Sequence, residues 1–132
     1  MSAAQNKEII SNMFAELSKG NAEAFLSTLA DDVNFSLIGS TKFSGVFKGK
    51  AEFVEKVLAP LGAQLENGLT MHVDNLIAEG NNVVMQGRGE SMTKSGKAYN
   101  NTYAQVFRLE NGKVQQVTEY LDTELVNAVF GK

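Results

Sequence analysis

The chain has 132 residues, 43% of them hydrophobic, and a formal net charge of −3, which predicts one domain with a proper core. The scattered Lys and Arg residues argue against a nucleic-acid partner, because phosphate binding needs clustered positive charge. Cysteine is absent and histidine occurs once, as His72, so we expect no disulfide, no thiol nucleophile and no multi-histidine metal site.

Helices are predicted mainly in the first half of the chain. Apolar residues recur there at spacings of three and four, which is typical of amphipathic helices. Gly20 ends the first helix, Asn21 can cap the second, and Pro60 with Gly62 should end the third. The predicted segments are residues 4–17, 22–29 and 50–58.

Strands alternate with and follow these helices. "DDVNFSLIG" and "TKFSGVFKG" predict two strands in the first half. After Gly68 the period changes, and residues 69–78, 81–92, 98–110 and 112–122 read as four strands. Asn111-Gly112 is the strongest hairpin signal in the chain. A short helix over residues 123–130 should close the chain.

This order of elements predicts an α+β fold. A curved, mostly antiparallel sheet with the N-terminal helices on its concave side would bury every apolar face. Gly87 and Gly89 suit a bent strand, since glycine often marks bulges and sharp curvature.

Targeting and cofactor signals are not visible in the sequence. No apolar run approaches the length of a membrane span, and "MSAAQNKEII" has no signal-peptide pattern. We therefore expect a cytoplasmic protein with no membrane partner. No phosphate loop or dinucleotide motif occurs, and we expect no cofactor.

Three stretches of sequence resemble a known family. "NMFAELSKGNAEAFLSTLADDVNF" followed by "GVFKGKAEFVEKVLAPL" resembles the opening of SnoaL-like proteins, and "YNNTYAQVFRLENGKVQQVTEYLDT" resembles their close. These proteins share the nuclear transport factor 2 fold with ketosteroid isomerase and limonene epoxide hydrolase. The resemblance implies a cone with a deep pocket for a small apolar molecule, and a homodimer formed through the outer sheet face.

Glu119 is the leading candidate for a functional group. Val117, Glu119 and Leu121 share one face of the last strand, because strand side chains alternate in direction. A carboxyl between two apolar neighbours is desolvated, which raises its pKa and suits it to general acid or base catalysis. The resemblance likewise implies that the last strand points an acid into the cone. The alternative is a carboxylate at a sheet rim or in a dimer interface.

Arg88 and Glu90 share a face of an earlier strand, in "GRGES". Limonene epoxide hydrolase has an Arg-x-Asp in the corresponding strand, where the arginine bridges two acids. The resemblance would make Arg88, Glu90 and Glu119 such a catalytic trio. The alternative is an exposed ion pair of small energetic worth.

Further residues are expected to line the pocket or to bind the ligand. Apolar residues from the first helix and the first strand should face Glu119. Tyr99, Asn101 and Tyr103 alternate along one strand and offer uncharged hydrogen-bonding groups, although an outer face or a dimer contact suits them equally. The expected pocket residues are Phe14, Phe35, Leu37, Asn101, Tyr103, Val117 and Leu121.

Two classes of function remain open from the sequence. Ketosteroid isomerase activity is disfavoured, because Leu37 and Ile38 occupy the place of its base and Met13 and Phe14 that of its tyrosine. An acid–base enzyme that catalyses cyclisation, dehydration or epoxide hydrolysis on a small apolar substrate is the first class. A non-catalytic binding or dimerisation module is the second.

Overall fold

The computed structural model describes all 132 residues. Helix α1 (Ala3–Ser18) begins with a capping box, in which the Ser2 hydroxyl accepts a hydrogen bond from the Gln5 amide and the Gln5 side chain accepts one from the Ser2 amide. Helix α2 (Ala22–Thr28) begins at the predicted cap, Asn21, whose side chain accepts a hydrogen bond from Ala24 N at 3.2 Å. Both predicted helices are therefore confirmed.

The third helical segment is longer than predicted. It runs from α3 (Lys50–Phe53) through a π-helical turn, η1 (Val54–Leu58), into α4 (Ala59–Gln64). The prediction that Pro60 ends this helix is wrong. Pro60 lies in the first turn of α4, directly after the π-helical turn, and in a first turn the missing amide proton of proline costs little.

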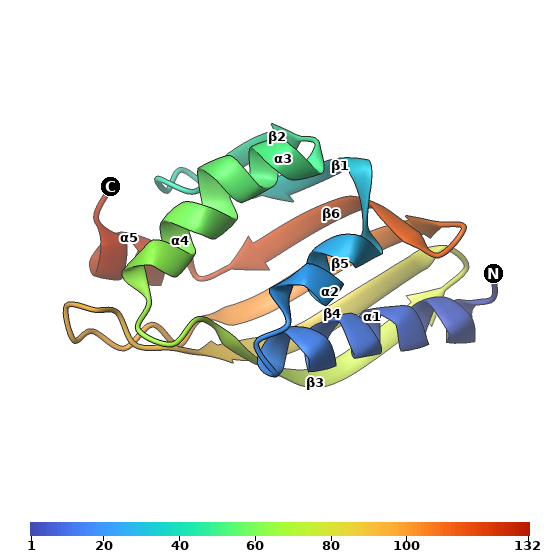
Figure 1. Cartoon of the computed structure of the whole chain (residues 1–132), viewed down its shortest axis with the longest axis horizontal. Helices are drawn as coiled ribbons and strands as arrows, with labels where there is room; N and C mark the ends of the chain where they lie inside the picture. Colours follow the sequence, from blue (N-terminus) through green and yellow to red (C-terminus); the bar gives the residue numbers. More distant parts are fainter.

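A single curved sheet lies behind these helices (Figure 1). Its spatial order is β2-β1-β6-β5-β4-β3, and only the β1–β6 pair is parallel. The α+β prediction of a curved, mostly antiparallel sheet is confirmed. The strands are β1 (Leu29–Leu37), β2 (Gly45–Lys48), β3 (Thr70–Glu79), β4 (Asn82–Glu90), β5 (Thr102–Glu110) and β6 (Lys113–Leu121).

Helix α5 (Thr123–Phe130) follows β6 directly and closes the chain, as predicted. Asp122 caps it by accepting a hydrogen bond from Leu125 N at 3.2 Å. Phe130 packs edge-on against Phe43 and Tyr99, with ring centroids 5.5 and 4.8 Å away. The C-terminal helix thereby fixes the residues at one end of the sheet.

The inner face of the sheet is built from cross-strand rows of side chains. One row joins Phe35, Val117, Phe107 and Val83 through the strand registers and is almost fully buried. Phe14 of α1 packs on Phe107 with ring centroids 5.9 Å apart. This row fills one end of the space between sheet and helices, while the other end is less tightly filled.

None of the helices combines the length and the apolar composition that a membrane span requires.

Candidate functional site

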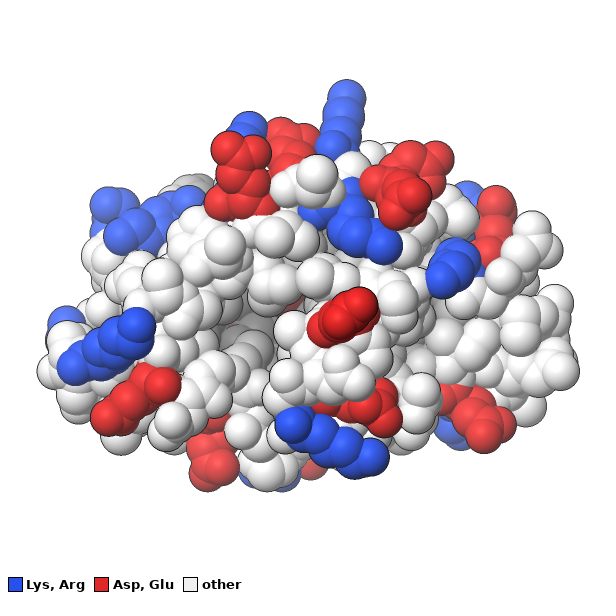
Figure 2. Space-filling view, viewed as in Figure 1, with Lys and Arg blue, Asp and Glu red and all other residues white.

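A cavity of about 380 Å³ lies between the helices and the inner face of the sheet. In the space-filling view its mouth is a hollow among mainly uncharged residues (Figure 2). Most of its lining is apolar, contributed by α1, α2, β1, the α3–α4 segment and β3. Concave, largely apolar spaces with a few polar groups are the usual form of small-molecule sites.

Most of the predicted pocket residues line this cavity. They are Phe14, Phe35, Leu37, Tyr103 and Leu121. Val117 does not, because it lies in the filled row between Phe35 and Phe107 and is only 1% exposed. Asn101 does not line it either, because its side chain is engaged by neighbouring protein groups. The prediction that Val117 and Asn101 line the pocket is therefore wrong.

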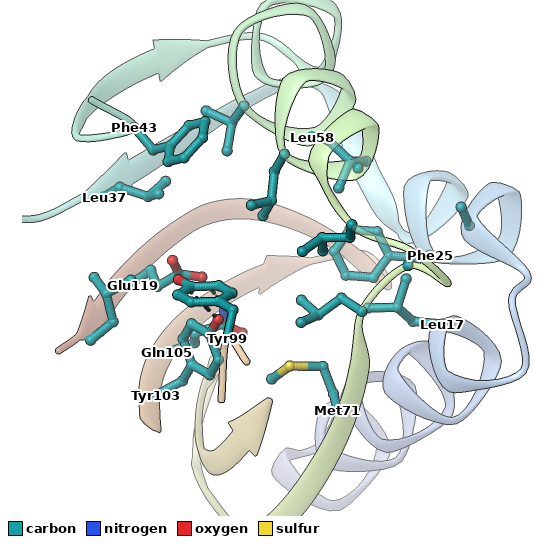
Figure 3. Close-up of a pocket in the computed structure, with 18 of the residues that line it drawn as sticks. Leu17, Phe25, Leu37, Phe43, Leu58, Met71, Tyr99, Tyr103, Gln105 and Glu119 are labelled. Atoms are coloured by element: carbon teal, nitrogen blue, oxygen red, sulfur yellow. Dashed lines mark hydrogen bonds between the residues drawn. The ribbon is translucent and has the colours of Figure 1, made fainter. Parts of the chain in front are cut away.

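Glu119 points into the cavity from the middle of the sheet (Figure 3). The strand registers place it in one row between Leu37 of β1 and Gln105 of β5. Gln105 Nε2 donates a hydrogen bond to Glu119 Oε1. The side chain is partly accessible, and we attribute this accessibility to the cavity that it lines.

Burial raises the pKa of Glu119 to about 7, and the hydrogen bond from Gln105 opposes part of that rise. No Lys, Arg or His lines the cavity, so no positive charge restores the carboxyl to its ordinary range. Both protonation states of Glu119 are therefore populated near neutral pH. A carboxyl in that condition can accept or donate a proton.

Two tyrosines lie beside Glu119 at the same end of the cavity (Figure 3). Tyr103 is on β5, two positions before Gln105, whereas Tyr99 lies in the segment before that strand. The Tyr99 hydroxyl accepts hydrogen bonds from Asn101 Nδ2 at 3.1 Å and from the Tyr103 hydroxyl at 3.5 Å. Burial raises the pKa of both phenols, so both remain protonated.

Asn101 holds this arrangement in place. Its Oδ1 accepts hydrogen bonds from the backbone amides of Thr102 and Asp122, at 2.7 and 3.0 Å, and its Nδ2 also donates to Asp122 O at 3.1 Å. The side chain is only 1% exposed. Asn101 is therefore a positioning residue for Tyr99 rather than a wall of the cavity.

The predicted trio of Arg88, Glu90 and Glu119 does not form. In β4, Gly87 and Gly89 face inward, so the alternate residues Arg88 and Glu90 face outward, away from Glu119. Arg88 Nε instead donates to Asp74 at 3.0 Å. The prediction failed because cross-strand register decides which residues of β4 lie on the same face of the sheet as Glu119 of β6. The sequence did not reveal that register.

The surroundings of the other proposed catalytic acid also differ from the prediction. Glu90 lies 3.5 Å from His72 Nε2, and its side chain is 69% exposed. The Arg88 hydrogen bond holds the pKa of Asp74 below its ordinary value. Arg88 and Asp74 form an exposed ion pair on the outer face, and Glu90 lies there beside His72. No group of three or more His, Asp or Glu side chains in the structure could hold a metal ion.

Gln105, which lines the cavity and hydrogen-bonds Glu119, is the residue of this site that the sequence analysis missed. It shares the inward face of β5 with Tyr103, and this two-residue spacing was the available signal. A regular hairpin around Asn111-Gly112 would place Gln105 opposite Thr118. A bulge between Arg108 and Leu109 shifts the register and places Gln105 opposite Glu119.

The sequence matches the family model for the SnoaL-like domain over residues 10–117. The chain belongs to the SnoaL-like family. No curated protein matches the sequence. Solved structures similar to this SnoaL-like chain support the fold that it shares with NTF2-like proteins.

Three of those structures illustrate the similarity. An NTF2-like protein of unknown function from Burkholderia pseudomallei matches with a TM-score of 0.84 and 18% identity, over 100% of both chains. A protein assigned as a SnoaL-like polyketide cyclase from Jannaschia matches with a TM-score of 0.79 and 18% identity, over 98% of this chain and 93% of that one. TerC, co-crystallised with polyporic acid, matches with a TM-score of 0.78 and 22% identity, over 93% and 98%.

Proposed function

We propose that this SnoaL-like protein binds a small, mostly apolar molecule in the cavity and that Glu119 exchanges a proton with it. The observation that carries the proposal is the Glu119 carboxyl facing an apolar cavity, where burial raises its pKa to about 7. Perturbed carboxyls in clefts are good candidates for acid–base catalysts. The expected reaction class is a proton-transfer reaction such as cyclisation or dehydration.

Two of the similar structures support an organic ligand by analogy. One is assigned as a polyketide cyclase, and TerC was crystallised with polyporic acid. Epoxide hydrolysis by an arginine-bridged pair of acids is not part of the proposal, because Arg88 lies on the other face of the sheet.

Diphenyldiazomethane, a small apolar diazo compound, tests this proposal directly. A protonated carboxyl transfers its proton to the diazo carbon, N2 leaves, and the carboxylate then bonds to the resulting carbocation to form an ester. At about pH 7, ordinary surface carboxyls are ionised, whereas about half of the Glu119 population is protonated. Peptide mass spectrometry should therefore find the ester at Glu119.

The matched control is Glu119→Gln, which keeps the shape of the side chain and removes the acid. This variant should remain unlabelled, and labelling of the native protein should fall as the pH rises through about 7. Labelling confined to exposed acids such as Glu90 would show that no proton reaches an apolar molecule from Glu119.

The second part of the proposal is a homodimer formed through the outer sheet face. In-register residues make an outer row across all six strands, and it carries mainly β-branched side chains. The row consists of Ile77, Val84, Val106, Thr118, Ser36 and Val46. Its terminal residues Ile77 and Val46 are 54% and 60% exposed. Helices α1 and α2 and the α3–α4 segment lie on the opposite face of the sheet (Figure 1), so they leave this row uncovered. The same row of a second copy, related by a two-fold axis, could cover it.

A further inference from the structure

The Tyr99 hydroxyl has a proton that no group of the protein accepts. A phenol can donate one hydrogen bond and accept others. Tyr99 Oη accepts from Asn101 and from Tyr103, and its own proton is donated to no protein atom. Buried hydrogen-bonding groups in folded proteins are nearly always used. An unused donor at the wall of a cavity therefore indicates a partner within the cavity.

The charge of the lining restricts what that partner can be. Glu119 is the only charged residue of the cavity wall, and no Lys, Arg or His accompanies it. An anionic ligand would be buried without a counter-charge and next to an acid, which is costly. The remaining wall around the tyrosines is mainly aliphatic and aromatic, which suits a ligand with an apolar body.

We propose that Tyr99 donates a hydrogen bond to the carbonyl oxygen of an uncharged, mostly apolar ketone or ester bound in the cavity. The inference rests on the proposed function insofar as the ligand occupies the same cavity. It assigns binding of the carbonyl group to Tyr99 and leaves proton transfer to Glu119. A carbonyl oxygen is a pure acceptor, so it fits the free donor of Tyr99.

The surroundings of Tyr99 make it a strong and well-oriented donor. Two hydrogen bonds donated to its oxygen polarise the O–H group, because linked hydrogen bonds strengthen one another. Asn101 is held by three hydrogen bonds to backbone groups, and Phe130 packs edge-on against the Tyr99 ring at 4.8 Å. The hydroxyl therefore keeps its position without a ligand, which lowers the entropic cost of binding.

Binding of three matched probes tests the inference at about pH 6, where Glu119 is mostly protonated. Acetophenone carries a carbonyl, ethylbenzene has the same shape without the oxygen, and benzoate carries a negative charge. NMR titrations should show binding of acetophenone, and binding of benzoate should be at least about tenfold weaker.

Tyr99→Phe removes the hydroxyl and keeps the ring. It should weaken acetophenone binding by about two- to tenfold, the usual range for one neutral hydrogen bond, and leave ethylbenzene binding unchanged. Tyr103→Phe should weaken acetophenone binding less, because it removes only a donor to Tyr99. Tyr120→Phe is the matched control, since Tyr120 is 46% exposed, and it should change neither affinity.

The inference is overturned if Tyr99→Phe leaves acetophenone binding unchanged, if it weakens ethylbenzene equally, or if the native protein binds benzoate as well as acetophenone or does not bind acetophenone. Failure here is distinguishable from failure of the proposed function. Esterification of Glu119 by diphenyldiazomethane requires no hydrogen bond from Tyr99, so it can succeed when this inference fails.

Discussion

Gln105 and Glu119 face each other across β5 and β6, and the Gln105 amide is the hydrogen-bond donor to the Glu119 carboxylate. The amide stabilises the ionised form without supplying a positive charge. Burial dominates, so the pKa of Glu119 stays near 7 rather than returning to its ordinary value. The balance between these two effects sets the pH range in which Glu119 can exchange protons.

Gln105→Met should raise the pKa of Glu119 further. Methionine fills a similar volume but cannot donate, and a hydrogen bond to a charged group is worth about 1.5–3 kcal/mol, or roughly one to two pKa units. The pH dependence of esterification by diphenyldiazomethane should move upward accordingly. An unchanged or downward-shifted profile would mean that Gln105 does not stabilise the carboxylate.

Glu119 should make the native fold less stable as the pH rises. Its pKa in the folded chain is about 7, against an ordinary value of 4.5, so the folded state binds more protons between these limits. Stability contributed by this group is complete below about pH 4.5 and lost by about pH 7, with an upper limit of about 3 kcal/mol.

Glu119→Gln isolates that effect, because glutamine does not titrate. Urea unfolding at about pH 5 and about pH 8 should show a smaller loss of stability for the variant than for the native chain. Subtracting the loss of stability in the variant from the loss in the native chain removes the contribution of the other acids, which both proteins share. Equal losses in both proteins would contradict the raised pKa.

Gly89→Ala should disturb the tyrosines of the cavity. An added Cβ would lie 3.0 Å from Tyr103 Cε2 and 3.3 Å from Leu69 Cδ1, so both side chains must shift slightly to make room for it. We expect a loss of about 1–3 kcal/mol in stability and weaker acetophenone binding. Thermal unfolding and the same NMR titration measure the two effects.

Gly62→Ala is the matched control for that substitution. Gly62 lies in α4 with no heavy atom within 4 Å of an added Cβ, and alanine is favoured over glycine in helices by roughly 0.5–1 kcal/mol. This variant should be slightly more stable than the native chain. If both variants lost stability equally, contact with Tyr103 would not explain the effect at Gly89.

Ile77→Lys should disrupt the proposed homodimer. Ile77 ends the outer row of residues and is 54% exposed, so lysine is tolerated in a monomer but places a charge in a self-complementary interface. Multi-angle light scattering should give the mass of a dimer for the native chain and a lower mass for the variant. A native chain that stays monomeric at high concentration would contradict the homodimer.

The fold was largely predictable because its signals are local. Helical spacing, the cap at Asn21 and the Asn111-Gly112 turn each depend on neighbouring residues. The inward direction of Glu119 followed from its apolar neighbours on one strand face. The continuation of the third helix past Pro60 was not predictable, because it depends on a π-helical turn that the apolar spacing does not specify.

The site was less predictable because it depends on register between strands. Arg88 and Glu90 do share a face, as predicted, but it is the outer one. The bulge in the β5–β6 hairpin decides which residue of β5 meets Glu119. Val114 and Val117 are both buried although they are three residues apart. In a regular strand such residues would lie on opposite faces, so this spacing was the sign of the bulge in the sequence. Such relationships join residues that are distant in the sequence, so local patterns do not determine them.

Measurement of the pKa of Glu119 tests the proposed proton exchange most directly. Carbon-detected NMR of protein labelled at the glutamate carboxyl carbons follows each acid through a pH titration, and Glu119→Gln identifies the resonance by its loss. The midpoint for Glu119 should lie at about 7. A midpoint near 4.5, the ordinary value of a glutamate, would contradict the role of Glu119 as the proton-exchanging group of the cavity.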